Sequence, residues 1–138
     1  MREIFVDTSA WDAIVDSGDP NHELAVLFRD EIAGQCRLVV TNYILDELYT
    51  LLLMNVGYQR AVAFKSVLDV LVQEAILQVV WISEDLALEA WNVFLQFNAD
   101  EQWSFTDCVS YVVMKQRGNG EAFAFDNHFE QMGFTRLP

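Results

Sequence analysis

Two aspartates each follow directly on a short apolar run with the composition of a buried strand. Asp7 comes after residues 4–6, and Asp126 comes after residues 122–125. Parallel strands of an α/β sheet point their carboxyl ends toward one edge, and ligands bind beyond that edge. The pattern therefore predicts that these two carboxylates lie together, although they are far apart in the sequence, and that they are candidates for catalysis.

Both aspartates could instead serve as helix caps, because Asp is one of the best residues at that position. A better cap is available in each case. Ser9 and Asp12 form a capping-box pattern after the first apolar run, and Asn127 and Glu130 form another after the last. We therefore expect the two strand-end aspartates to be functional rather than structural.

Two further acids carry weaker signals. Glu47 flanks the apolar face of a helix predicted over residues 43–54, where an ordinary exposed acid is an equally good interpretation. Asp107 follows Ser104 by three residues, which is a capping-box spacing that needs no catalysis. On local grounds, both interpretations stay open at these two positions.

Acids that converge without enough Lys or Arg to pair with them are costly unless a cation neutralises them. Hard divalent ions meet that need. Mg²⁺ prefers carboxylate and water ligands, and two such ions can hold the attacking and leaving oxygens of a phosphodiester. The acids therefore point to metal-assisted phosphodiester hydrolysis.

The rest of the sequence predicts an α/β fold that would position these acids. Short apolar runs alternate with amphipathic helices, which is the pattern of a mostly parallel sheet covered by helices. We expect strands at residues 4–6, 38–40, 77–82 and 122–125, with an edge strand at 134–137. Helices are expected from Ser9, from Pro20 toward Gly34, over 43–54 and 58–73, from Ser83 to about residue 97, from Ser104 toward Gly118, and briefly after Asp126.

Length and charge limit the class of protein. The chain has 138 residues, 53% of them apolar, which predicts a single domain spanning residues 1–138. With 21 Asp and Glu against 8 Lys and Arg, the net charge of −13 argues against a broadly basic nucleic-acid binder, so any RNA contact must be local. Two isolated cysteines and the lack of an apolar stretch of membrane-spanning length predict a cytoplasmic protein with reduced thiols and no membrane partner.

Four short segments resemble the acidic blocks of PIN-domain ribonucleases, above all those of the VapC-type toxins of toxin–antitoxin pairs. The segments are residues 6–10, 45–47, 103–108 and 125–129, and they contain the four acids in order. The resemblance extends over essentially the whole chain, including residues 133–138. Each block alone is a weak signal, whereas four blocks in order with these spacings are a specific one.

The resemblance implies a three-layer α/β/α PIN-like fold and an endoribonuclease that depends on Mg²⁺ or Mn²⁺. The residues that match the catalytic, metal-binding acids of the family are Asp7, Glu47, Asp107 and Asp126. Thr106 and Ser9 match hydroxyl residues that orient those carboxylates or a water molecule. The family further implies a homodimer and an antitoxin partner.

The expected reaction is attack of an activated water on the phosphorus of an RNA phosphodiester, with the 3′-oxygen as the leaving group. Its products would carry 5′-phosphate and 3′-hydroxyl ends. Attack by the ribose 2′-hydroxyl would instead give a cyclic phosphate, so the product ends test the mechanism.

Several other residues that could touch RNA have a more ordinary interpretation. His128 lies beside Phe129 and is expected to be a packing residue. Trp103 precedes the Asp107 block and could either border the site or anchor its loop. Most other aromatic residues are expected in the core or at interfaces, and solvated faces are expected for the scattered cations Arg29, Arg60, Lys65, Lys115 and Arg117.

Two other classes of protein compete with a nuclease. One is a PIN-like module that binds RNA or protein without significant catalysis, which the acidic surface favours and the complete set of four acids disfavours. The other is a phospho-acceptor receiver domain, which requires paired acids near the start and a Lys after a late strand; this sequence has neither. Metal-dependent cleavage would separate the nuclease from the binding module.

Overall fold

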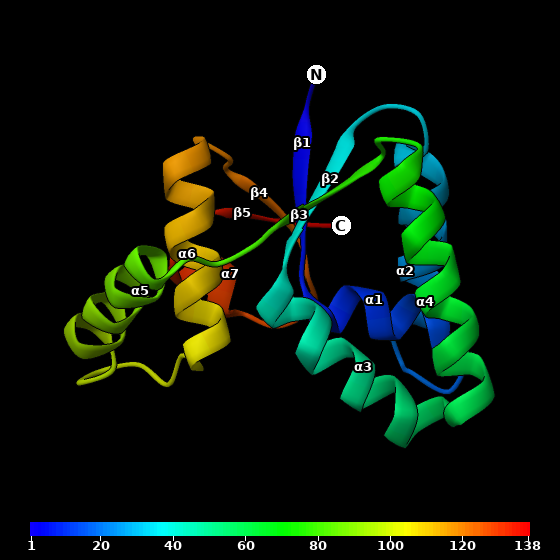
Figure 1. Cartoon of the computed structure of the whole chain (residues 1–138), viewed down its shortest axis with the longest axis horizontal. Coiled ribbons are helices and arrows are strands. Elements are labelled where there is room, and N and C mark those ends of the chain that lie inside the picture. The colour runs from blue at the N-terminus through cyan, green and yellow to red at the C-terminus, as the bar shows by residue number, and fades with distance from the viewer.

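The computed structural model describes all residues, 1–138, and contains five strands and seven helices (Figure 1). The strands are β1 (Glu3–Val6), β2 (Arg37–Thr41), β3 (Leu77–Val80), β4 (Glu121–Phe123) and β5 (Thr135–Leu137). The helices are α1 (Thr8–Val15), α2 (His22–Ile32), α3 (Asn42–Val56), α4 (Tyr58–Gln73), α5 (Glu84–Phe97), α6 (Phe105–Arg117) and α7 (His128–Gln131).

All five strands are parallel and form one sheet in the order β3-β2-β1-β4-β5. The central strand is β1, in which Phe5 lies opposite Val39 of β2 and Val6 lies opposite Phe123 of β4. Strands that are buried on both faces need apolar side chains at every position, which explains the continuous apolar run in β1. The carboxyl ends of all five strands consequently lie at one edge of the sheet.

Helices cover both faces of the sheet and give the three layers that the sequence predicted. Figure 1 shows α1, α2, α3 and α4 on one side of the strands and α5, α6 and α7 on the other. Phe5, Phe123 and Phe129 are the largest of the side chains that are completely or almost completely buried. Replacing any of them with alanine would cost about 3–5 kcal/mol of stability. The predicted α/β fold with a parallel central sheet is confirmed.

Most helix boundaries follow the local sequence signals. Helix α4 spans Tyr58–Gln73 as predicted, and Ser83 caps α5 by accepting a hydrogen bond from the N–H of Leu86. Ser104 and Asp107 form the predicted capping box of α6. None of the helices combines the length and the apolar character that crossing a membrane requires.

Two predicted capping boxes are wrong. The N-cap of α1 is Asp7, and Ser9 is instead inside the helix. Asn127 makes no side-chain cap at α7, where the N–H of His128 donates to Asp126 Oδ1 over 3.1 Å. In both places the strand-end aspartate does the capping that the sequence pattern assigned to its neighbour.

Helix α2 also begins later than predicted, at His22 rather than at Pro20. The Asp19 side chain accepts a hydrogen bond from the N–H of Asn21 over 2.7 Å. This local turn occupies the position of the first helical turn, because Asp side chains readily bond the backbone two residues on.

Candidate active site

Asp7 follows the central strand and is only 4% exposed. Its backbone N–H donates to the carbonyl oxygen of Phe123 in β4 over 3.0 Å, which fixes the end of the strand. Its Oδ2 atom accepts hydrogen bonds from the backbone N–H of Ser9 (3.2 Å) and from the Ser9 hydroxyl (2.7 Å). Asp7 therefore caps α1 and, at the same time, presents a fixed carboxylate at the carboxyl edge of the sheet.

The Ser9 hydroxyl joins the ends of two neighbouring strands. It donates to Asp7 Oδ2 and accepts a hydrogen bond from the backbone N–H of Phe125 over 3.0 Å. Because its single proton is given to Asp7, it holds that carboxylate in one orientation. Asp12, the residue that was expected to complete a capping box with Ser9, accepts hydrogen bonds from Asn55 of α3 instead.

Asp107 and Asp126 reach the same place from two other segments. Asp107 is the third residue of α6, is 7% exposed, and accepts a hydrogen bond from the backbone N–H of Ser104 over 3.0 Å. Asp126 follows β4, and about a third of its side chain is exposed. The negative charges of both acids act on Asp7. Three carboxylates from three segments therefore meet at the carboxyl edge of the sheet, including the pair that the strand pattern predicted.

His128 joins this cluster, contrary to the packing role expected for it. Its Nδ1 lies 2.7 Å from Asp107 Oδ2 and 3.8 Å from Asp126 Oδ1. The atom makes no hydrogen bond of acceptable geometry, and the contact with Asp107 is an ion pair only when the imidazole is protonated. Packing against the core belongs to the next residue, Phe129, which is completely buried. The backbone N–H of His128 donates to Asp126 Oδ1, so the same residue contacts two of the three aspartates.

Burial and mutual repulsion favour the protonated forms of these acids. Burial raises the pKa of Asp7 well above its ordinary value, and the charge of Asp126 raises it further, against the hydrogen bond from Ser9 that lowers it. Burial also raises the pKa of Asp107, against the opposing effects of His128 and of the hydrogen bonds from Ser104. A positive charge bound at this point would lower both pKa values and keep the acids ionised.

No Lys or Arg pairs with these three aspartates. Five cations pair with other carboxylates: Arg2 with Glu121, Arg29 with Asp30, Lys65 with Asp69, Arg117 with Glu3, and Arg136 with Glu130. Of the others, Lys115 lies over the rings of Tyr111 and Phe134, and Arg60 donates to the carbonyl oxygen of Val15. The five cations for which solvated faces were predicted are indeed exposed or half-exposed. None of them pairs with an acid of the cluster.

Glu47 and Thr106, the remaining predicted site residues, have no contact with the three aspartates. Glu47 is exposed on α3 and makes no ion pair. The backbone carbonyl of Thr106 accepts a hydrogen bond from the Ser110 hydroxyl over 3.0 Å, and its own hydroxyl has no partner in the protein. As the side chains stand, no group of three or more acids, histidines and cysteines is arranged to hold a metal ion. The site is therefore a cluster of carboxylates rather than a closed coordination sphere.

The chemistry of this donor set nevertheless fits a hard divalent ion. Carboxylate oxygens are ligands that Mg²⁺ and Mn²⁺ prefer. Asp7 is held by Ser9, and Asp107 is held by Ser104, so both carboxylates are oriented in advance. Their negative charge is offset by no Lys or Arg. Such a site can bind a divalent cation and bring it against a phosphodiester.

Trp103 anchors the loop that precedes α6. It is 3% exposed, and its backbone N–H and carbonyl bond the side chain of Asn98 over 2.8 and 2.9 Å. Its indole N–H donates to Gln131 of α7 over 3.1 Å, and its ring stacks on Phe97 and Tyr111. Of the two roles that the sequence left open for Trp103, the structure supports the anchoring role.

Comparison with known proteins identifies the family. The PIN domain family matches residues 4–135 of the chain. The chain therefore belongs to the PIN-domain family, and the predicted resemblance to that family is confirmed. Within the family it is similar to two curated proteins from strains of Mycobacterium tuberculosis named 23S rRNA-specific endonuclease VapC20, with 33% identity over 135 residues and 97% of each chain covered.

Solved structures agree with this assignment. The crystal structure of Mycobacterium tuberculosis VapC20, described as a sarcin–ricin loop cleaving toxin, matches with a TM-score of 0.80 and 30% identity over 96% of both chains. A structure of VapBC2 from Rickettsia felis, bound to a DNA fragment from their promoter, matches with a TM-score of 0.67 over 97% of this chain and 96% of that one. At 9% identity the second match shows the fold alone. The prediction of a VapC-type endoribonuclease is confirmed.

Proposed function

We propose that the protein cleaves RNA with Mg²⁺ or Mn²⁺ held by Asp7, Asp107 and Asp126, and that Glu47 of α3 is the fourth acidic ligand. The observation that carries the proposal is the convergence of three carboxylates, from three separate segments, at one edge of the sheet without a Lys or Arg partner. A cluster of this kind is costly unless a cation neutralises it. The same residues match the acidic blocks of the family.

Each residue has a role that its surroundings suggest. Asp7 anchors the ion, because it is buried and fixed by two hydrogen bonds from Ser9. Asp107 has one oxygen engaged by Ser104, and Asp126 is the most exposed of the three and hence the most accessible to RNA. The Thr106 hydroxyl, which has no partner in the protein, is available to a water molecule or a phosphate oxygen.

The chemistry that a divalent ion supplies in such a site is activation of water and neutralisation of charge on the attacked phosphate. The acids of this chain bind and orient the ion, and Ser9 keeps the carboxylate of Asp7 from rotating. Attack of water at phosphorus breaks the bond to the 3′-oxygen. The products are a 5′-phosphate and a 3′-hydroxyl.

A ribosomal RNA loop is the substrate that we propose, and an antitoxin is the partner. The support is the similarity to VapC20, whose name and structure specify 23S rRNA and the sarcin–ricin loop. VapC toxins pair with VapB antitoxins. A homodimer of single PIN-like domains, each spanning residues 1–138, completes the proposal.

The test is cleavage of ribosomal RNA by the purified protein, freed of any bound partner, in Mg²⁺, Mn²⁺ or EDTA, followed by mapping of the product ends. We expect cleavage with either metal, none in EDTA, and 5′-phosphate ends. Asp7→Asn should abolish cleavage while circular dichroism shows an intact fold. Cleavage that persists both in EDTA and in Asp7→Asn would contradict the proposal.

Glu47 needs a separate test, because no contact joins it to the other acids. Glu47→Gln should lower the cleavage rate by about 10²-fold, the effect of losing one supporting group of a metal site. Asp46→Asn makes the same kind of change at its exposed neighbour and should leave the rate unchanged. Equal rates in the two variants would remove Glu47 from the site. Failure of the folded wild-type protein to cleave any RNA would instead favour a PIN-like module that binds without catalysis.

A further inference from the structure

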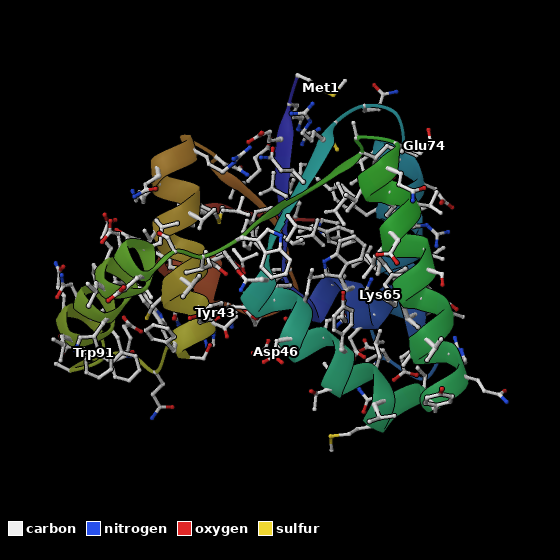
Figure 2. The ribbon with its side chains drawn as sticks, viewed as in Figure 1. Met1, Tyr43, Asp46, Lys65, Glu74 and Trp91 are labelled. Atoms are coloured by element: carbon white, nitrogen blue, oxygen red, sulfur yellow. The ribbon has the colours of Figure 1, made fainter.

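An aromatic pair lies at the edge of the acidic cluster and has no part in the proposed chemistry. Tyr43 is the second residue of α3, and Phe105 is the first residue of α6. Their ring centroids are 5.9 Å apart, and the ring planes are inclined by 47°. Figure 2 shows Tyr43 at the start of α3, on the side that faces α6. The pair therefore bridges the two helices that carry Glu47 and Asp107.

The two helices that carry the rings also carry two of the proposed site acids. Phe105 precedes Asp107 by two residues in the first turn of α6. Tyr43 precedes Glu47 by four residues, so the two lie on one face of α3. Helix α3 begins directly after β2, the neighbour of β1, and Tyr43 is therefore at the same edge of the sheet as Asp7.

The pair is accessible to a ligand. Both side chains are only partly buried, and the Tyr43 hydroxyl makes no hydrogen bond with the protein and is not enclosed by it. The cluster around Trp103 is different, because that ring is buried and its indole N–H is bonded to Gln131. A partly exposed aromatic ring is well suited to stack on the ring face of an unpaired base.

The charge of this edge favours contacts with bases over contacts with phosphates. The protein has a net charge of −13, and no Lys or Arg pairs with the site acids. Proteins that bind RNA backbones rely on cations that displace counterions. Because no Lys or Arg pairs with the site acids, we expect stacking to supply part of the affinity for RNA.

We propose that Tyr43 and Phe105 form a stacking platform for an unpaired base next to the phosphate that is cleaved. The substrate class is accordingly RNA whose bases at the cleavage site are unstacked and turned outward, as in a loop, rather than paired in a helix. The inference rests on the proposed function for the position of the phosphate. Stacking of the base, however, needs neither metal nor catalysis and can be measured by itself.

The experiment uses three variants of the full chain. Tyr43→Phe keeps the ring and removes only the unbonded hydroxyl, and Tyr43→Leu removes the ring. Tyr58→Leu is the matched control, because Tyr58 is a 72% exposed tyrosine at the start of α4, away from the acids. Binding is measured in EDTA with a mixed-sequence single-stranded RNA and with its duplex. Cleavage is measured on an oligonucleotide that spans the mapped cut, either intact or with the adjoining base removed.

We expect Tyr43→Leu to weaken single-strand binding and to raise KM on the intact oligonucleotide by about 5- to 100-fold, with little change in kcat. Tyr43→Phe and Tyr58→Leu should behave like the wild type. The wild type should lose a similar factor on the abasic oligonucleotide, and Tyr43→Leu should lose nothing further there. Single strands should bind better than the duplex, and their affinity should depend only weakly on salt.

Equal losses by Tyr43→Leu on the intact and abasic oligonucleotides would overturn the inference, because the ring would then act on the fold and not on a base. A changed oligomeric state of Tyr43→Leu in light scattering would also overturn it, since the pair would then belong to a protein interface. If the wild type binds single strands through Tyr43 but cleaves nothing with either metal, the proposed function fails and the platform stands.

Discussion

Acidic side chains are paired with arginines at one end of the central sheet and have no Lys or Arg partner at the other. At the amino ends of the strands, Arg2 donates two hydrogen bonds of 2.8 Å to Glu121 of β4. Arg117 of α6 donates to Glu3 of β1 over 2.6 and 3.3 Å and to Gln78 of β3 over 3.1 Å. The two acids on the strands at this end, Glu3 and Glu121, therefore each have a guanidinium partner, and the partners tie neighbouring elements together.

At the carboxyl ends of the strands, three aspartates meet with only His128 beside them. The pKa values reflect the difference between the ends. The hydrogen bond from Arg2 lowers the pKa of Glu121, whereas burial and the charge of Asp126 raise the pKa of Asp7.

This contrast distinguishes the acids at the amino end of the sheet, which have a structural role, from those at the carboxyl end, for which we propose a functional role. The same small sheet satisfies its acids with arginines at one end and leaves them unsatisfied at the other. Groups that burial and like charges perturb together are candidates for binding or catalysis. The protein tolerates the repulsion at one end because a cation and an RNA phosphate are the intended partners there, in the proposal made above.

The largest difference between the two ends should be seen in activity. Asp107→Asn should lower RNA cleavage by about 10³-fold or more, because an oriented charge of the site is lost. Glu121→Gln removes an acid at the opposite end and should leave the rate unchanged. Single-turnover cleavage of ribosomal RNA in saturating Mg²⁺ measures both variants. Comparable losses would mean that the two ends do not differ in function.

The paired end should matter for stability instead. Arg117→Met breaks the contacts with Glu3 and Gln78 and should lower the free energy of unfolding by about 1 kcal/mol, since the ion pair is bidentate but about a quarter exposed. Arg29→Met, which breaks an exposed pair with Asp30, is the control and should cost less than about 0.5 kcal/mol. Urea unfolding monitored by circular dichroism gives both values, and equal costs would argue against a special role for the pairs at the sheet.

At the unpaired end, removing a charge should stabilise the protein. Asp7→Asn should raise the free energy of unfolding of the metal-free protein by about 1 kcal/mol at neutral pH, because it removes a buried charge that Asp126 repels. The amide oxygen can still accept the hydrogen bonds from Ser9. Thermal unfolding in EDTA measures the gain, and Mg²⁺ should then stabilise the wild type but not the variant.

The pH dependence of that gain tests its cause. A raised pKa means that folded wild-type protein keeps a proton on Asp7 that the unfolded chain has released. The contribution of Asp7 to stability therefore falls as the pH rises from the ordinary carboxyl pKa through the raised value. The gain from Asp7→Asn should be close to zero near pH 4, roughly the pKa of a free carboxyl group, and should grow toward neutral pH. A gain that is constant across this range would assign it to something other than charge.

The smallest expected effect concerns the two thiols, one near each end of the sheet. Burial raises the pKa of Cys36, which lies near Arg2 and Glu121, and burial with the charge of Asp107 raises the pKa of Cys108 to about 11. Neither thiol should react with a disulfide reagent at about pH 8 in the folded protein, and both should react in guanidinium chloride. Reaction of one thiol without denaturant would contradict this expectation and identify the end of the sheet that opens.

The scaffold of the protein could be predicted from local sequence patterns. The helix over Tyr58–Gln73 and the apolar strand at residues 4–6 depend on the periodicity of near neighbours, which one sequence contains in full. The meeting of Asp7 and Asp126 was predictable as well, because parallel strands share a direction and hence an edge.

Contacts between distant segments were harder to predict. Residues 125–129 do not encode the approach of α6, so the 2.7 Å distance between His128 Nδ1 and Asp107 Oδ2 could not be predicted from them. The cap of α1 is a similar case. Asp7 and Ser9 are both good caps, and Ser9 is instead engaged with Phe125 from the other end of the chain. The participation of Glu47 stays a prediction, since the exposed side chain has no contact that fixes it.

The central strand pairs with segments that are very far apart in the sequence. β1 lies between β2 and β4, and its Val6 is opposite Phe123. Contacts of such long sequence separation form late in folding, because a large loop must close before they stabilise the chain. The acids therefore come together only when β4 is in place. A chain that ends before β4 lacks Asp126, and one that ends before α6 lacks Asp107 as well. The acidic cluster is consequently a property of the whole fold, and a truncation or a proteolytic cut that removes β4 leaves no such cluster in any remaining fragment.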